Sequence, residues 1–240
     1  MRVVQAVRVG VAPARKHGGQ ADAEKPAGNA SAVPASETAT AVVGEVVALF
    51  RRIAQAEGWQ PGGELDAYPD RSVYFALRRT GEAGKQTGKD GVVGGLHLVL
   101  PDARGLLPGH RVWPELPVPD PPGSAAHILV LAADGAEPAS SGAGEPSPFW
   151  HLCAAMWGYC VEQGVRELRL EATPKMLRCY RLLGWPLVVR GELREHWGEP
   201  CYPCSLSVRE VAGSLAEKAA RSRVYRRVLA DMVGIRIADG

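Results

Sequence analysis

The sequence lacks any apolar run long enough to cross a membrane. Its longest apolar stretches, residues 92–100 and 127–133, fall far short of the roughly 20 residues that a membrane-spanning helix needs. Arg2 and Arg8 interrupt the first apolar residues of the chain, which therefore lack the continuous apolar core of a secretory signal. We expect a cytoplasmic protein with no membrane span.

An excess of one charge is also absent. The 28 Lys and Arg residues nearly balance the 26 Asp and Glu residues, and the net charge of +2 excludes a general attraction for nucleic acid. Hydrophobic residues make up 46% of the chain, which is too many for a wholly disordered protein. The length of 240 residues fits one globular domain with additional segments.

Cysteine is too sparse for a disulfide framework or a zinc site. The chain has five cysteines, an odd number that suits a reducing compartment. Cys201 and Cys204 have the C-x-x-C spacing, but no second Cys pair and no nearby pair of histidines completes four ligands. On a strand these two positions face opposite sides, so we expect no bound metal and no separate cofactor.

Composition divides the chain into three parts. Residues 12–35 contain no aromatic residue and are rich in Ala, Gly and Pro, which predicts a flexible N-terminal segment over residues 1–38. Residues 39–210 carry the apolar patterns of a folded domain. Ser214 and Glu217 have the spacing of a capping box, which predicts an amphipathic basic helix within residues 211–240. This helix either docks on the core with a solvated basic face or binds an acidic partner.

Within the central part, apolar periodicity predicts both helices and strands. A stripe of apolar residues predicts a helix from Ser36 to Gly58. Strands are expected at residues 72–78, 91–100, 125–133, 166–171, 185–189 and 201–208, with further helices at 148–163 and 174–183. The stretch 125–133 is apolar almost throughout, as in a strand covered on both faces. This order predicts an α/β protein.

A distinctive series of motifs follows the expected 148–163 helix. The strand GVRELRLEAT leads to a T-x-x-M-x-R motif that begins at Thr173, then to a helix-ending LGW and the strand CYPCSLSV. This series resembles the C-terminal half of the acyl-homoserine-lactone synthases, the autoinducer synthases of quorum sensing, within the GNAT acyltransferase superfamily. The stretches FRRIAQAEGW, ELDAYPD and GVVGGLHLVLP extend the resemblance over residues 42–208.

The resemblance implies a GNAT-like mixed central β-sheet flanked by helices, and an N-acyltransferase. Such an enzyme moves a fatty acyl group from acyl-coenzyme A or acyl carrier protein to a small amine. The transfer requires an unprotonated amine, hence a base, and hydrogen-bond donors aimed at the developing oxyanion. Both the carrier and the acceptor remain open.

Several polar positions depart from the family pattern. His97 stands where the family has Arg, and Pro69 stands where it has a second Asp. On the expected 125–133 strand, His127 replaces a Glu and Val130 replaces an Arg. In the family these charged residues shape the pocket for S-adenosylmethionine. The resemblance therefore does not carry this acceptor over to the present chain.

The resemblance and the required chemistry together select candidate site residues. The catalytic candidates are His127 and His97, the acceptor-binding candidates Trp59, Asp66 and Trp113, the acyl-binding candidates Val130, Thr173 and Met176, and the phosphate-binding candidates Gly142 and Gly144 of the SSGAG segment. Glycines before a helix allow backbone N–H groups to converge on an anion. Each residue type also has a structural explanation, since buried histidines bond to backbone and tryptophans pack in cores.

Two other functions stay open. A GNAT-fold protein without catalysis would bind an acyl group or a partner and form no product. Ordinary acetyl transfer would require an Arg or Gln where the phosphate loop has Ala139. If the basic C-terminal helix binds an acidic carrier protein, turnover depends on Arg221, Arg223 and Arg227.

Overall fold

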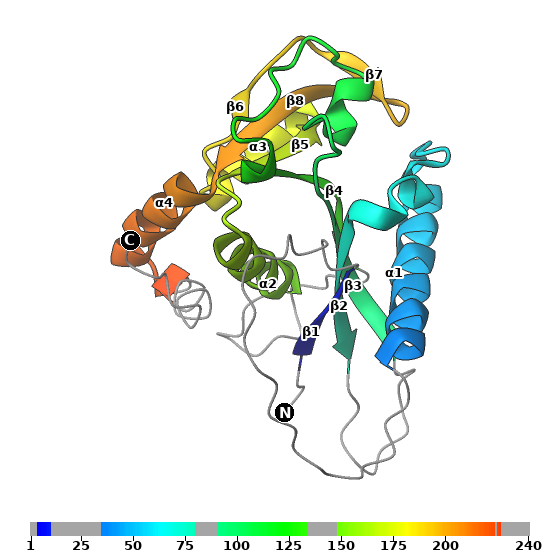
Figure 1. Cartoon of the computed structure of the whole chain (residues 1–240). Helices are drawn as coiled ribbons and strands as arrows, with labels where there is room; N and C mark the ends of the chain where they lie inside the picture. Colours follow the sequence, from blue (N-terminus) through cyan, green and yellow to red (C-terminus); the bar gives the residue numbers. More distant parts are fainter. Residues whose placement is uncertain (1–3, 11–34, 80–90, 134–147, 224, 227–240) are drawn as a thin grey trace, which may run out of the picture.

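The described residues form a mixed β-sheet with helices on both faces. The computed structural model describes residues 4–10, 35–79, 91–133, 148–223 and 225–226 (Figure 1). The strands follow the order β1-β2-β3-β4-β5-β8-β6, and β7 pairs with β8. They are β1 Val4–Gly10, β2 Ser72–Arg79, β3 Gly91–Val99, β4 Ala125–Ala133, β5 Glu167–Ala172, β6 Val188–Val189, β7 Arg194–His196 and β8 Glu199–Ser207. The predicted mixed α/β sheet is confirmed.

The helices begin and end at local sequence signals. They are α1 Ala35–Glu57, α2 Pro148–Gln163, α3 Pro174–Leu183 and α4 Val208–Arg221. The Thr173 hydroxyl caps α3 by accepting a hydrogen bond from the Met176 N–H at 3.2 Å, and Gly184 ends α3 with a φ of 98°. The helices predicted at 148–163 and 174–183 are confirmed. No helix in the described ranges is long and apolar enough to cross a membrane.

Two adjacent glycines bring helices close to both faces of β3. Figure 1 shows α1 on one face of the sheet and α2 on the other. A Cβ atom at Gly95 would lie 2.8 Å from Val46 and 2.9 Å from Phe50, both on α1. A Cβ atom at Gly94 would lie 3.3 Å from Leu152 of α2. The glycines that weaken the strand pattern of the sequence thus allow close helix packing on both sides.

The parallel strands β4 and β5 pair only at their beginnings. Residues 125–127 of β4 pair with residues 167–169 of β5, and the ladder stops there. The ladder between β3 and β4 also skips Leu129, which bulges β4 at the same place. From Ile128 onward, the backbone of β4 therefore has no strand partner on its β5 side.

The N-terminal segment contains an unexpected strand. Residues 4–10 form β1, which pairs antiparallel with β2, and α1 already begins at Ala35. The prediction of a flexible segment over 1–38 is therefore wrong for these residues. Residues 11–34 lie outside the described part of the chain.

The C-terminal helix begins earlier than the sequence suggests. Its first residue is Val208, and the Ser207 hydroxyl caps it by accepting a hydrogen bond from the Glu210 N–H at 3.2 Å. Ser207 and Glu210 have the same S-x-x-E spacing as the predicted cap, Ser214 and Glu217. The prediction chose the second of two equivalent signals, so the start of the helix was wrong. Residues 227–240 of the predicted helix lie outside the described ranges.

Candidate active site

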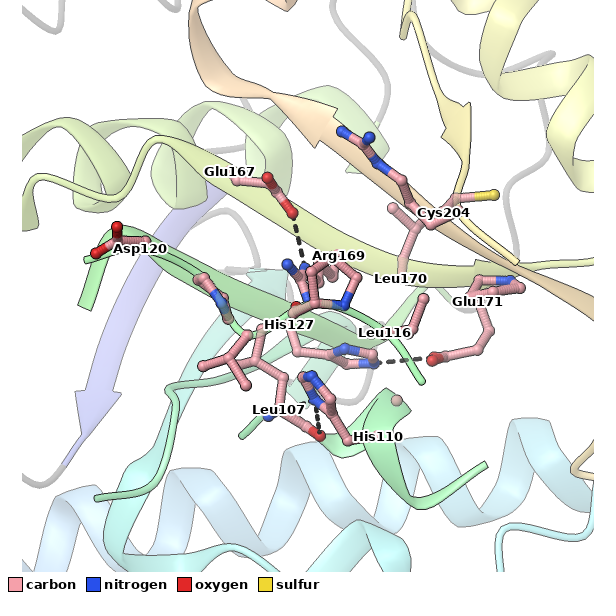
Figure 2. A pocket seen from close by; sticks show the side chains of 16 residues that line it. Leu107, His110, Leu116, Asp120, His127, Glu167, Arg169, Leu170, Glu171 and Cys204 are labelled. Carbon is pink, nitrogen blue, oxygen red and sulfur yellow. Dashed lines mark hydrogen bonds and ion pairs between the residues drawn. The ribbon is translucent and has the colours of Figure 1, made fainter. Parts of the chain in front are cut away.

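A cavity of about 210 Å³ lies over β4 and β5 (Figure 2). It is lined by Leu107, Gly109, His110, Leu116, Pro117, Val118, Pro119, Asp120, His127, Glu167, Arg169, Leu170, Glu171, Arg190, Pro203 and Cys204. Arg169 ties the loop that forms one wall to β5. Its Nε donates to Glu167 Oε1 at 2.7 Å, and its Nη1 donates to the Pro117 carbonyl at 2.7 Å. We call this space the first cavity.

A buried histidine and carboxylate meet in the first cavity. His127 Nε2 lies 2.9 Å from Glu171 Oε2, and the two side chains are only 1% and 8% exposed. Burial by itself raises the pKa of the Glu171 carboxyl, but His127 and His196 outweigh burial, so this pKa lies below its ordinary value. An ionised carboxylate only accepts hydrogen bonds. A neutral His127 ring therefore carries its proton on Nε2 and keeps a lone pair on Nδ1.

The His127 Nδ1 atom has no hydrogen-bond partner among the described residues. The His110 Nε2 atom, on another lining residue, is likewise buried and unpartnered. Gly109 lies against the pair, because a Cβ atom there would be 2.8 Å from Glu171 Oε1 and 3.4 Å from His127 Cε1. Buried polar atoms normally find partners, so these two nitrogens can bond a molecule in the first cavity. Two further unpartnered atoms, His97 Nδ1 and Arg78 Nε, belong to residues that line neither cavity. The geometry leaves His127 Nδ1 free to accept a proton.

A second cavity, of about 150 Å³, lies beyond the point where β4 and β5 separate. It is lined by Trp59, Ile128, Leu129, Val130, Leu131, Leu170, Glu171, Thr173, Met176, Tyr180, His196, Trp197, Glu199 and Cys201. The two cavities have Leu170 and Glu171 in common. Glu171 thus faces both spaces, whereas His127 lines only the first.

The turn between β7 and β8 supplies one wall of the second cavity. Trp197 has a φ of 55°, a left-handed conformation that is rare for a bulky residue. Its indole N–H donates to Glu64 Oε2 at 2.7 Å, and its carbonyl accepts from the Gln60 N–H at 2.9 Å. Its ring stacks on His196 with centroids 5.2 Å apart. These contacts hold the strained turn against the segment that follows α1.

The structure gathers the acyl-binding candidates but scatters the acceptor-binding ones. Val130, Thr173 and Met176 all line the second cavity, and Trp59 lines it too. Asp66 is 57% exposed and pairs with Arg51, and it lines neither cavity. Trp113 is fully buried and donates its indole N–H to the Glu192 carbonyl at 2.8 Å. Gly142 and Gly144 lie outside the described residues.

His97, the second catalytic candidate, lines neither cavity. Its ring is fully buried and stacks on Tyr74 with centroids 4.2 Å apart. The Ser72 hydroxyl donates its one proton to the Tyr68 carbonyl at 2.6 Å, so it accepts from His97 Nε2 at 2.7 Å. Burial, with a contribution from His127, lowers the pKa of His97 to about 3. These contacts account for His97 as a neutral structural residue.

The depressed pKa of His97 predicts acid sensitivity of the fold. Below pH 6.5, the ordinary histidine pKa, His97 of the unfolded chain is protonated, whereas His97 of the folded chain stays neutral down to about pH 3. The contribution of His97 to the free energy of unfolding is thus fully present above pH 6.5, and the free energy of unfolding falls by about 1.4 kcal/mol per pH unit below it. His97→Gln, which can still donate to Ser72, removes this slope. Urea unfolding between pH 7 and 5 checks it, and equal slopes for both chains would contradict the assignment.

Sequence reasoning missed Glu171, His196 and Glu64. Glu171 stands in the quoted stretch RLEAT, directly before the T-x-x-M-x-R motif, but it becomes notable only beside His127. His196 Nε2 lies 4.0 Å from Glu171 Oε2 and 4.0 Å from Glu64 Oε2. These residues come from separate segments that only the fold brings together. Within the described residues, no group of three or more His, Cys, Asp or Glu side chains is placed to hold a metal ion.

Solved structures share this fold, although no protein-family model and no curated protein matches the sequence. FeeM, an N-acyl amino acid synthase from uncultured soil microbes, is 18% identical with a TM-score of 0.58, over 90% of this chain and 100% of that chain. The acyl-homoserine lactone synthase LasI is 13% identical with a TM-score of 0.52, over 87% and 90% of the two chains. The CoA-dependent acyl-homoserine lactone synthase BjaI is 15% identical with a TM-score of 0.50, over 82% and 83%.

At these identities the likeness concerns the fold. The chain therefore has the GNAT-like acyltransferase fold of the acyl-homoserine lactone synthases and of the N-acyl amino acid synthase, as its motifs predicted.

Proposed function

We propose that this chain is an N-acyltransferase that moves a fatty acyl group from an acyl thioester to the nitrogen of a small amine. One observation carries the proposal: the buried His127–Glu171 pair lies where two cavities meet. Transfer between two molecules needs two binding spaces that converge on a base. The fold shared with enzymes named as N-acyl amino acid and acyl-homoserine lactone synthases supports this reaction class.

The second cavity suits the thioester. One wall is the stretch of β4 from Ile128 onward, whose backbone has no strand partner toward β5. Such an edge offers N–H groups to the amides of a carrier arm and to the carbonyl oxygen as it becomes negative. Val130, Thr173 and Met176 then contact the acyl chain. The phosphate-binding role of Gly142 and Gly144 stays a prediction.

The carrier is either coenzyme A or acyl carrier protein. BjaI, which shares the fold, is described as CoA-dependent and was solved with S-adenosylmethionine and isopentyl-CoA. On the present chain, the last turn of α4 carries Lys218 and Arg221, a basic surface that an acidic carrier protein would bind. Rates with the two donors, measured at low and high salt, distinguish these carriers. Salt screens the attraction between the basic helix and an acidic carrier protein, so the rate with that donor falls first.

The first cavity suits the amine. As the amine nitrogen attacks the thioester carbonyl, the new N–C bond forms and His127 Nδ1 accepts a proton from nitrogen. Glu171 keeps the ring in the required tautomer and stabilises the positive charge that the ring acquires. The tetrahedral intermediate then breaks its C–S bond and releases an amide and a thiol. No additional cofactor is required.

Mass spectrometry of lipid extracts tests the proposal without a prior guess of substrate. Cells that express the unmodified chain are compared with cells that express His127→Ala. We expect a new acyl-amide only with the unmodified chain, and its mass identifies both the acyl chain and the amine. If both proteins are soluble and folded and no amide appears, the alternative of a non-catalytic GNAT-fold protein that binds an acyl group or a partner is favoured.

A further inference from the structure

The departing thiolate needs a proton, and the His127–Glu171 pair does not supply it, because His127 does not line the thioester cavity and Glu171 is an ionised carboxylate. A coenzyme A or pantetheine thiolate is basic enough that its release is assisted by a general acid. Because the thioester occupies the second cavity, this acid must line that cavity. His127 lines only the first cavity. A second proton-carrying residue is therefore required.

We propose that His196 is the general acid that protonates the leaving thiolate. This inference rests on the proposed acyl transfer. His196 ends β7, lines the second cavity, and has a side chain that is only 12% exposed. Its Nε2 atom lies 4.0 Å from Glu171 Oε2 and 4.0 Å from Glu64 Oε2. Two carboxylates thus flank the nitrogen.

The protein holds His196 in place from several sides. Its ring stacks on Trp197, at 5.2 Å between centroids, and lies 6.0 Å from the ring of Trp113. Glu64, one of the two carboxylates, accepts the Trp197 indole N–H and pairs with Arg111 at 3.5 Å. Both rings of this left-handed turn line the second cavity. The contacts of Trp197 and Glu64 offset the strain of the turn.

The two histidines divide the proton transfers between the two cavities. His127 takes the proton that the amine nitrogen loses when the N–C bond forms. The C–S bond breaks with its electron pair on sulfur, and His196 gives that sulfur a proton. After the products leave, His127 Nδ1 releases its proton to solvent and His196 takes up one proton from solvent. The turnover therefore consumes no net acid or base, and both residues regain their initial state.

Tyr180 is the competing acid in the second cavity. Its ring stacks on Trp185 with centroids 5.1 Å apart. Burial raises the pKa of its hydroxyl well above the ordinary value, which makes it a weak donor. The raised pKa of Tyr180, caused chiefly by burial, therefore leaves His196 as the proposed acid of this cavity.

The experiment varies the acidity of the leaving thiol. One donor is octanoyl-coenzyme A, and the other is the octanoyl thioester of thiophenol, whose thiolate leaves without a proton. The acceptor is the amine identified in the lipid extracts. With octanoyl-coenzyme A, His196→Gln lowers kcat by about 100-fold. With the thiophenol ester, the same variant falls within about threefold of the unmodified chain, since the acid is no longer needed.

Three further variants make the result decisive. His127→Gln stays slow with both donors, because the amine still needs its base. Glu64→Gln keeps a hydrogen-bond acceptor for Trp197. Its kcat falls less than that of His196→Gln with octanoyl-coenzyme A and likewise returns toward the unmodified value with the thiophenol ester. His151→Gln on α2 lines neither cavity and leaves both rates unchanged.

If His196→Gln lowers kcat equally with both donors, the general-acid role is overturned. The same holds if Tyr180→Phe, and not His196→Gln, loses rate with octanoyl-coenzyme A and regains it with the thiophenol ester. Absence of any amide from the unmodified chain would overturn the acyl transfer itself, a distinct result.

Discussion

Glu171→Gln lowers kcat for acyl-amide formation by about 1,000-fold and leaves the fold intact. The carboxylate accepts the His127 Nε2–H at 2.9 Å and so keeps the ring lone pair on Nδ1. A carboxamide can donate to Nε2 instead, which moves the ring proton to Nδ1 and blocks proton uptake from the amine. It also removes the negative charge that stabilises the protonated ring. Initial rates with octanoyl-coenzyme A, followed by mass spectrometry of the amide, measure the loss.

The matched control is Glu195→Gln, an exposed carboxylate on β7 that lines neither cavity. This variant keeps the rate of the unmodified chain. The loss in Glu171→Gln lies mainly in kcat, because the group acts in the transition state and contributes little to thioester binding. A Glu171→Gln enzyme within tenfold of the unmodified rate would remove the His127–Glu171 pair from the mechanism.

Gly109→Ala reduces turnover by about 100-fold, because small misplacements of catalytic groups have effects of this size. The new methyl would lie 2.8 Å from Glu171 Oε1 and 3.4 Å from His127 Cε1. The carboxylate is the end of a flexible side chain, so it moves away and its hydrogen bond to His127 lengthens. The backbone φ of Gly109 is not left-handed, so alanine adds no conformational strain. Thermal unfolding therefore changes little while activity falls.

Gly123→Ala is the control for this substitution. Gly123 lies in a similar short turn, Pro122–Ser124, and a Cβ atom there meets nothing within 4 Å. We expect full activity from it. Rates and melting temperatures of both variants are measured together. Full activity in Gly109→Ala, with a crystal structure that shows an unmoved Glu171, would contradict the close approach on which the prediction depends.

Local signals were sufficient for elements whose ends are marked by nearby residues. Thr173 and Gly184 delimit α3, and the stretch 125–133, apolar almost throughout, marks β4. Elements that depend on distant partners were missed. β1 pairs with β2, which lies more than sixty residues away, and no pattern within residues 4–10 predicts that pairing. The start of α4 was misplaced because two S-x-x-E signals follow each other and only packing selects between them.

The site shows the same division. His127 was predicted because it stands where the family has an acidic residue and because imidazole can act as a base, and the structure places it beside a cavity. Glu171 was not predicted, because its importance comes from the parallel register that pairs His127 with Arg169, two residues before it. Trp59 and Asp66 were grouped by sequence position, yet only Trp59 lines a cavity. Sequence identifies suitable residue types, whereas distances between segments require the fold.

The short ladder between β4 and β5 has a consequence for how this molecule can be altered. Among the described residues the sheet consists of two halves, β1 to β4 and β5 to β8, and the strand ladder that joins them covers only residues 125–127 and 167–169. Long ladders lie within each half, so a substitution in one half leaves the backbone pairing of the other unchanged. Thr173 and Met176 belong to the second half, and His127 belongs to the first. Each cavity is nevertheless lined by residues of both halves, so exchange of a whole half-sheet between related chains would alter both binding spaces together.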